Sequence, residues 1–339
     1  MNAKGSFMKN FFSMPSLVPC LFFSTSIASA TDTQNSTFNT LAVTTPRPSQ
    51  DVSVHAAVAV AELLDKMTIL EIKLERFTDE TKFKNVRAEY AVLQAMYTAH
   101  IPQSARLDGL KKELMEKNKK LWELEDAIRA KESSKNFDGE FINLARAIYL
   151  NNDERGLIKR DINTLVGSHI IEEKSYGEYR TDIEAKKRSW NEQTTASAQK
   201  QNTVTIMIEM PVGELLDKIT ILEIKQANIT NIDKLKNITT ELAILYTTLH
   251  EHVAQTAQLI DLIDQLRMHN KKMWEIEDQI REKEHLQEFD ASFIQLARDV
   301  YYTNDKRCAV KRTINMLLGS RLIEEKKYTE YGQEKIATA

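Results

Sequence analysis

The sequence predicts an all-α protein of two tandem up-and-down helical bundles, each of about four helices. Only nine glycines and six prolines occur among 339 residues, and long turn-free segments rich in Leu, Ile, Ala, Glu and Lys favour helices. One stretch also occurs twice, as ELLDKMTILEIK at 62–73 and as ELLDKITILEIK at 214–225. The same register, an offset of 152 residues, holds without a gap as far as Tyr179 and Tyr331, which indicates an internal duplication.

Composition and turn signals divide the chain into six segments. We predict a signal peptide (1–30), a flexible linker (31–55), a first helical module (56–180), a second linker (181–203), a second helical module (204–332) and a tail (333–339). The first linker is polar and lacks an apolar period, and the second is polar and charged, with residues 183–188 able to continue the helical end of the first module. At the start of the second module, residues 204–208 can form a short strand, because Pro211 breaks the chain just after them.

The N-terminus has the pattern of an export signal. Lys9 is followed by an apolar run as far as Phe23, and the small side chains of Ala28-Ser-Ala30 suit a signal peptidase. This pattern predicts a periplasmic or secreted protein whose mature chain begins near Thr31. The apolar run is too short to span a bilayer as a stable helix, so no transmembrane segment is expected after signal removal.

Charge and motif content exclude several classes of function. The net charge is −3, and a mildly acidic protein repels phosphate backbones, so no nucleic-acid partner is expected. The sequence contains no Gly-rich phosphate loop, no nucleophile elbow and no zinc signature, so we expect no cofactor and no metal. Export leaves Cys308 as the only cysteine, which cannot form an internal disulfide.

Helix signals place the later helices of the first module over 82–99 and 104–131. Pro102 separates these two helices. A further helix is expected to begin after Asp138, whose carboxylate can accept from free backbone N–H groups, and to end at Gly167, which can adopt the left-handed conformation. Asp290 and Gly319 repeat these signals in the second module.

The repeated stretch is apolar on two sides when it is placed on a helix. Its leucines and Met67 form a broad arc that predicts the core face. Glu71 falls inside this arc, and Asp65 lies between Ile69 and Ile72, which form a second apolar patch. Both carboxylates are therefore expected to be partly buried, and a buried carboxylate requires a basic partner.

Polar residues of the later helices fall on stripes that can face these carboxylates, which predicts a polar seam in each module. Two interpretations stay open: internal ion pairs that fix the helix register, or a pocket whose Lys and Arg side chains bind a carboxylate or phosphate group. In the first module the candidates are Asp65, Lys66, Glu71, Lys73, Asn118, Trp122, Arg129, Asp153, Arg155 and Lys159. In the second module they are Asp217, Lys218, Glu223, Lys225, Asn270, Trp274, Arg281, Asp305, Arg307 and Lys311.

Five motifs in order carry a resemblance to a known family. They are PVGELLDKITILEIK (211–225), WEIED (274–278), YTND (302–305), KRTIN (311–315) and the segment from Gly319-Ser to EEK (324–326). Together they resemble an uncharacterised bacterial family of short, single-module proteins, domain of unknown function 6165. The resemblance implies a compact helical domain and carries over no activity and no site residues. This chain differs in having two copies and an export signal, and its first copy lacks Pro-Val-Gly.

These observations favour a non-enzymatic binding or scaffolding module. Two linked copies gain avidity for a repeated ligand, so an unknown protein or a polymeric ligand is the expected partner. The two modules could equally pack on each other as an internal pseudo-dimer. The alternative is an enzyme or a binding protein for a small anionic metabolite. The chain resembles exported chorismate mutases in fold class and charge only, because the order of its basic residues does not reproduce that family's motif.

Overall fold

The computed structural model describes residues 52–173 and 204–322, which we term the first half and the second half. All of these residues fall within one compact unit, Arg47–Ala339. The predicted signal peptide, the linker 181–203 and the tail 333–339 lie outside the described residues. We call two residues counterparts when they are 152 positions apart in the sequence.

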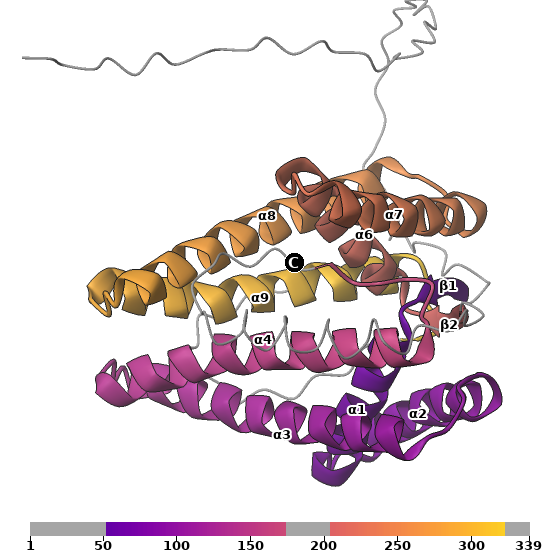
Figure 1. The fold of residues 1–339 in the computed structure, drawn as a ribbon. Helices are drawn as coiled ribbons and strands as arrows, with labels where there is room; N and C mark the ends of the chain where they lie inside the picture. Colours follow the sequence, from indigo (N-terminus) through magenta and orange to yellow (C-terminus); the bar gives the residue numbers. More distant parts are fainter. Residues whose placement is uncertain (1–51, 174–203, 323–339) are drawn as a thin grey trace, which may run out of the picture. The chain divides into compact units, whose positions relative to one another are not determined.

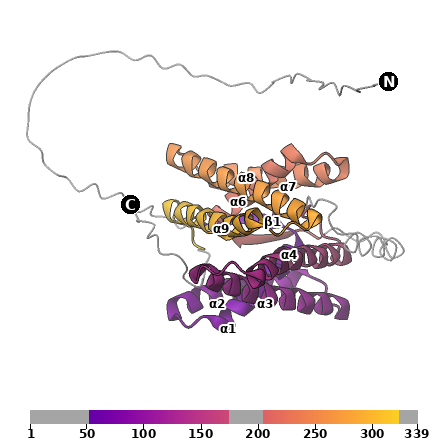
Figure 2. The ribbon, with the colours of Figure 1, turned by 90° about the vertical axis from the view of Figure 1, so that its left-hand side faces the viewer.

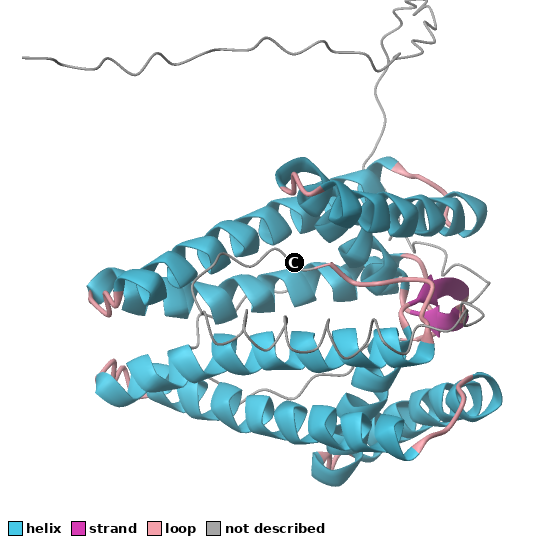
Figure 3. Cartoon of the chain, in the orientation of Figure 1, coloured by secondary structure: helices cyan, strands magenta, loops and turns pink. Residues whose placement is uncertain are grey.

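Helices dominate both described ranges, as the composition predicts, and they follow the same order in each (Figures 1 and 3). The first half contains β1 (Val54–Val58), α1 (Val60–Arg76), α2 (Glu80–His100), α3 (Ala105–Ser133) and α4 (Gly139–Val166). The second half contains β2 (Ile206–Met210), α6 (Val212–Asn228), α7 (Ile232–His252), α8 (Ala257–Leu286) and α9 (Ala291–Leu317).

The last helix of each half has the predicted ends. The Asp138 carboxylate accepts from the backbone N–H groups of Glu140 and Phe141, at 3.1 and 3.0 Å, where α4 begins. Gly167 ends α4 in the left-handed conformation, with φ of 65°. Asp290 caps α9 by accepting from the Phe293 backbone N–H at 3.0 Å, and Gly319 follows that helix with φ of 60°. Local capping chemistry therefore decides these boundaries.

The repeated stretch forms the first helix of each half, α1 and α6, at the centre of its half. α1 contacts α2, α3 and α4, and α6 contacts α7, α8 and α9. Leu63, Leu64 and Met67 are fully buried on α1, and Ile72 on the opposite side is also buried. A helix with neighbours on several sides needs apolar residues on more than one face, which explains the two-sided pattern.

A two-stranded antiparallel sheet joins the halves, and the sequence predicts only its second strand. β1 pairs with β2 so that Ala56 lies opposite its own counterpart, Ile208. β1 includes Val54 and His55, which the sequence assigns to a flexible linker, so the prediction missed this strand. The segment VHAAV is short and rich in alanine, which has a weak strand propensity, and the strand exists because β2 supplies its hydrogen-bonding partner.

The strand segments are exchanged between the halves. β1 contacts α7 of the second half, and β2 contacts α2 of the first half. Just before the strands, Val52 pairs with Ser320 in the second half, and Val204 pairs with Ser168 in the first half. The N-terminal segment of each half therefore packs against the other half.

The last helices, α4 and α9, contact each other across the halves (Figures 1 and 2). An apolar cluster separate from the main core surrounds this contact. Its buried members are four residues and their four counterparts: Ile128, Phe141, Ala145, Tyr149, Ile280, Phe293, Ala297 and Tyr301. Phe137 and Phe289, which precede the caps of the two helices, pack against the same cluster.

Candidate binding site

Asp65 lies in a closed ion-pair cluster between α1, α3 and α4. Both of its carboxylate oxygens accept from Arg155 Nη2 at 2.8 Å, and one also accepts from Asn118 Nδ2 at 2.9 Å. Lys159 Nζ lies 3.9 Å away. Burial alone would raise the pKa of Asp65, but the charges of Arg155 and Lys159 and the Asn118 hydrogen bond lower it below its usual value. In the first half, this part of the predicted seam consists of paired groups.

The ion-pair distances to Asp217, in the counterpart cluster, are longer than those to Asp65. Asn270 Nδ2 donates to Asp217 at 2.9 Å, as Asn118 does in the first half. Arg307 Nε, however, lies 3.8 Å from the Asp217 carboxylate, and Lys311 Nζ lies 3.7 Å from it. Arg307 also donates to the Asn270 side-chain oxygen at 3.3 Å. The same residue types are thus arranged differently in the two halves.

Glu71 and Glu223 each accept from one tyrosine and one basic residue, but these partners come from different positions. Glu71 accepts from the Tyr90 hydroxyl and from Lys111 Nζ, both at 2.9 Å. Glu223 accepts from the Tyr246 hydroxyl and, at 2.9 Å, from Arg267 Nε. Tyr246 and Arg267 each lie about one helical turn beyond the counterparts of Tyr90 and Lys111. The two glutamates therefore have structural roles at the helix contacts.

Lys66 and Lys218 link the first helices across the halves. Lys66 Nζ lies 3.0 Å from Glu89 on α2 and 3.0 Å from Glu214 of the second half. Lys218 Nζ makes the reciprocal contacts, at 2.5 Å to Glu62 and 3.1 Å to Glu241. Burial alone would lower the pKa of both lysines, but the neighbouring carboxylates raise it, so both ammonium groups remain charged.

Arg129 and Arg281 also cross between the halves. Arg129 is buried and lies 3.2 Å from Glu125 on its own helix and 3.4 Å from Asp305 of the second half. The same contacts recur at the counterpart positions, where Arg281 lies 2.9 Å from Glu277 and 3.2 Å from Asp153. The sequence places Arg129 among the candidate partners of a carboxylate in its own module. The structure shows that a carboxylate of the other half also holds it.

The sequence analysis did not select the most enclosed carboxylate at this interface, Glu132. It is fully buried and accepts from Arg298 Nε at 2.7 Å, Arg298 Nη2 at 3.0 Å and the Tyr301 hydroxyl at 2.6 Å. Its counterpart, Glu284, accepts twice at 2.8 Å from Arg146 and at 2.6 Å from Tyr149. Glu132 lies on the same face of its helix as Arg129, and this position was the one feature of the sequence that could have predicted its role at the interface.

The remaining candidates divide between the core and the half-to-half contact. Trp122 is half-buried against the main core, and the Arg76 guanidinium lies 5.4 Å from its ring. Lys73 is buried on α1. Glu172, which follows α4, lies 2.5 Å from Lys159 and 4.0 Å from Lys225 of the second half. Lys225 and Trp274 reach a cavity.

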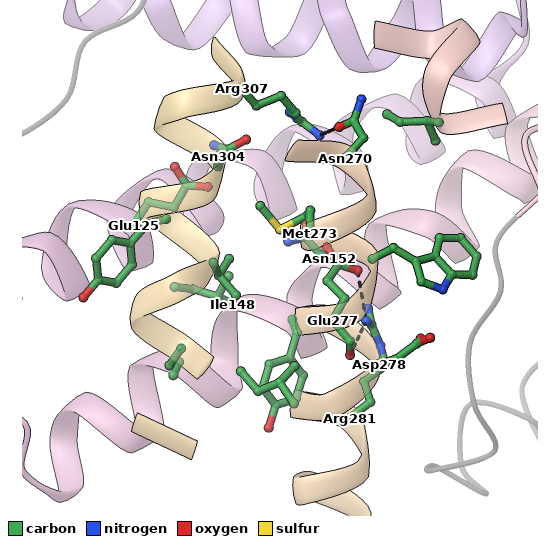
Figure 4. A pocket seen from close by; sticks show the side chains of 18 of the residues that line it. Glu125, Ile148, Asn152, Asn270, Met273, Glu277, Asp278, Arg281, Asn304 and Arg307 are labelled. Atoms are coloured by element: carbon green, nitrogen blue, oxygen red, sulfur yellow. Dashed lines mark hydrogen bonds and ion pairs between the residues drawn. The ribbon is translucent and has the colours of Figure 1, made fainter. Parts of the chain in front are cut away.

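This cavity lies between the halves and has a volume of about 370 Å³ (Figure 4). Residues of α3, α4, α6, α8 and α9 line it, and Glu172 adds a side chain from the segment after α4. Of the predicted seam residues, six line the cavity: Arg129, Lys225, Asn270, Trp274, Arg281 and Arg307. Close to these polar groups the wall is apolar, with Ile148, Ile221, Ile224, Met273 and Val300. The volume and the lining are typical of a small-molecule site.

Two further features bear on the chemistry of the described residues. Within 52–173 and 204–322, no group of three or more His, Cys, Asp or Glu side chains is arranged to hold a metal ion. The helices of the same ranges include none that is long and apolar enough to cross a membrane. The arrangement at the cavity can hold a ligand by apolar contact and by ion pairing.

The fold and the site define a mostly helical protein with a small antiparallel sheet and a cavity lined by basic, acidic and apolar side chains. Residues 54–197 match the model of a family of unknown function (DUF6165). No curated protein and no solved structure matches the chain. The match supports the family that the sequence resembles, although residues 211–326, which carry the quoted motifs, lie outside the matched range. The family's description assigns no activity.

Proposed function

We propose that the chain is a non-enzymatic binding module in which two copies of one four-helix, up-and-down domain pack as an internal pseudo-dimer. The observation that carries this proposal is the exchange of partners between the halves. Arg146 contacts Glu284, and their counterparts, Arg298 and Glu132, make the same contact with the halves reversed. Reciprocal contacts of this kind are typical of a two-fold interface between identical subunits.

The cavity supports a binding role for this interface. It is lined from both halves, so a ligand there would contact both copies at once. Arg129 and Arg281 each lie near two carboxylates, which hold their guanidinium groups in place at the wall. A protein or polymeric partner with a repeated structure would also suit a symmetric surface, because two linked sites add avidity.

Cleavage between the halves tests the pseudo-dimer. We expect that a protease site inserted within residues 181–203 can be cut in the folded protein without separating the two fragments. The strands, the ion pairs and the apolar cluster around α4 and α9 all connect the halves without that segment. The measurement is size-exclusion chromatography with mass detection, before and after cleavage.

A matched control weakens the interface and leaves the core of each half unchanged. In a protein carrying Arg146→Ala and Arg298→Ala, the cleaved fragments should separate more readily, because Glu284 and Glu132 lose their charged partners. Fragments of the unmodified sequence that elute as two separate species at micromolar concentration would contradict the pseudo-dimer.

Export to the periplasm or the medium is part of the same proposal and rests on residues 1–30 alone. We expect the protein purified from its native source to begin near Thr31. Intact-mass measurement and N-terminal sequencing check this. A native protein that retains Met1 would show that export by cleavage after Ala30 does not occur.

The cavity favours a second candidate function, an enzyme or a binding protein for a small anionic metabolite. Its support is the presence of Arg307, Lys225 and apolar side chains in the lining of one cavity. The likeness to chorismate mutases is limited to fold class and charge. Incubation with chorismate-like, phosphorylated and sugar-nucleotide compounds, followed by chromatography, separates the candidates. Turnover of any compound would replace the non-enzymatic proposal.

A further inference from the structure

The charged side chains that line the cavity balance one another. Among the described lining residues, the basic ones are Arg129, Lys225, Arg281 and Arg307, and the acidic ones are Glu125, Glu172, Glu277 and Asp278. Arg129 lies 3.2 Å from Glu125, and Arg281 lies 2.9 Å from Glu277. The formal charges of these residues sum to zero, so they give no net attraction for an ion of either sign.

Apolar side chains from both halves lie between the charged pairs. Ile148 on α4 and its counterpart on α9, Val300, both line the cavity. The second half adds Ile221 and Ile224 from α6 and Met273 from α8. Moving apolar ligand surface out of water against these side chains is favourable, and it breaks none of the ion pairs.

Two counterpart asparagines give the cavity uncharged hydrogen-bonding groups. Asn152 on α4 and Asn304 on α9 both line it (Figure 4). The Asn152 side-chain oxygen already accepts from Arg155 at 2.7 Å. No hydrogen bond joins the Asn304 side chain to another residue of the described ranges. A carboxamide both donates and accepts, so Asn304 can pair with an uncharged carboxamide or hydroxyl group.

We propose that this cavity binds one uncharged organic molecule, with an apolar body and a carboxamide or hydroxyl group that hydrogen-bonds to Asn304. This inference rests on the proposed binding function and names the ligand class of its cavity. Ile148, Val300 and Met273 would contact the apolar body. The volume of about 370 Å³ and the mixture of apolar walls with a few polar groups fit a ligand of this kind.

An anionic ligand of the same shape would bind less well. Its carboxylate would have to compete with Glu125 for Arg129, or with Glu172, which lies 4.0 Å from Lys225. It would also lose its own hydration, a cost that an uncharged group does not meet. A cationic ligand would face the same competition at the lining carboxylates. The cavity therefore discriminates by charge, and matched probes can measure this.

Isothermal titration of the full chain with matched probes tests the inference. The uncharged probes are 3-phenylpropionamide, indole-3-acetamide and 3-phenylpropan-1-ol, and the charged analogues are 3-phenylpropionate, indole-3-acetate and 3-phenylpropylamine. At least one uncharged probe should bind with one site per chain, and its charged analogues should bind at least about tenfold more weakly. A carboxylate or amine that binds as tightly as its uncharged analogue would overturn the inference, as would two sites per chain or no binding by any uncharged probe.

Variants on α9 assign the binding to this cavity. Asn304→Ala should weaken binding of the uncharged probe by about tenfold, because its polar group loses a hydrogen bond. Val300→Trp should abolish binding by filling the cavity. Met316 is exposed on the same helix and does not line the cavity, so Met316→Trp is the matched control and should leave the affinity unchanged.

Circular dichroism and thermal unfolding check that each variant is folded. Unchanged affinity in both Asn304→Ala and Val300→Trp would place the probe elsewhere and contradict the inference. If Val300→Trp does not fold, the comparison of Asn304→Ala with Met316→Trp decides the assignment by itself.

The cleavage experiment separates this inference from the proposed function. If the cleaved halves remain together and no uncharged probe binds, the ligand inference fails and the pseudo-dimer stands. If an anionic probe binds most tightly, the ligand inference fails in favour of the anionic metabolite of the second candidate function. If the halves separate, the pseudo-dimer proposal fails whatever the titration shows.

Discussion

Replacing Glu132 by alanine is expected to lower the free energy of unfolding by about 3–5 kcal/mol, the usual cost of removing one partner from a buried ion pair. Glu132 is fully buried and accepts from Arg298, Tyr301 and Tyr302 of the other half. The change would leave a guanidinium and two hydroxyl groups at the interface without their acceptor. Urea unfolding followed by circular dichroism measures the loss.

The counterpart variant, Glu284→Ala, is the matched control. Glu284 accepts from Arg146 and Tyr149, but Leu150 stands where Tyr302 stands in the other half. We therefore expect a smaller loss than for Glu132→Ala. A loss below about 1 kcal/mol in both variants, the range typical of exposed pairs, would show that this contact does not stabilise the interface.

The contribution of Glu132 should also depend on pH. Burial would raise the pKa of Glu132, but hydrogen bonds from Arg298, Lys135 and the tyrosines lower it to about 2, below the ordinary value of 4.5. Because the folded pKa is the lower one, this stability is present above pH 4.5 and is lost as pH falls toward 2. The stability difference between wild type and Glu132→Gln should therefore shrink from pH 7 to pH 2.5. A constant difference would contradict the depressed pKa.

The second large effect is expected at Asp65. Asp65→Ala would remove the carboxylate that holds the Arg155 guanidinium at 2.8 Å in the interior of the first half, whereas Lys159 would keep Glu172 at 2.5 Å. We expect a loss of about 3–5 kcal/mol in the free energy of unfolding. Urea unfolding monitored by fluorescence and circular dichroism measures it.

Asp217→Ala compares the second cluster, with its longer ion-pair distance to Arg307, with the first. Arg307 stands 3.8 Å from Asp217 and lines the cavity, so it depends less on that carboxylate than Arg155 depends on Asp65. The loss should be smaller than at Asp65 by about 1–2 kcal/mol. Equal losses would show that the two clusters are equivalent in solution.

Several features were predictable because they depend on neighbouring residues in the chain. Asp138 and Gly167 mark the ends of α4 through capping and a left-handed turn, and both signals are local. The burial of Leu63 and Met67 follows from the period of one helix. The strand β1 was missed because its hydrogen-bonding partner, β2, lies about 150 residues away in the chain.

The candidate site was predictable only in its residue types. Asp65 and Arg155 were both selected, but nothing in the spacing shows that their counterparts stand 3.8 Å apart rather than 2.8 Å. Glu71 and Glu223 obtain their partners from different turns of the neighbouring helices. Ion-pair partners are chosen by distance in space, and a helical period does not specify that distance.

The sequence by itself determined that this protein is mainly helical, that one stretch recurs at an offset of 152 residues, and where α4 and α9 begin and end. The tertiary structure alone decided that Glu132 and Arg129 meet partners from the other half, and that a cavity opens toward Arg307. The physical reason is that helix formation and capping depend on residues within a turn or two. Desolvated ion pairs and a cavity depend on how complete helices pack against each other.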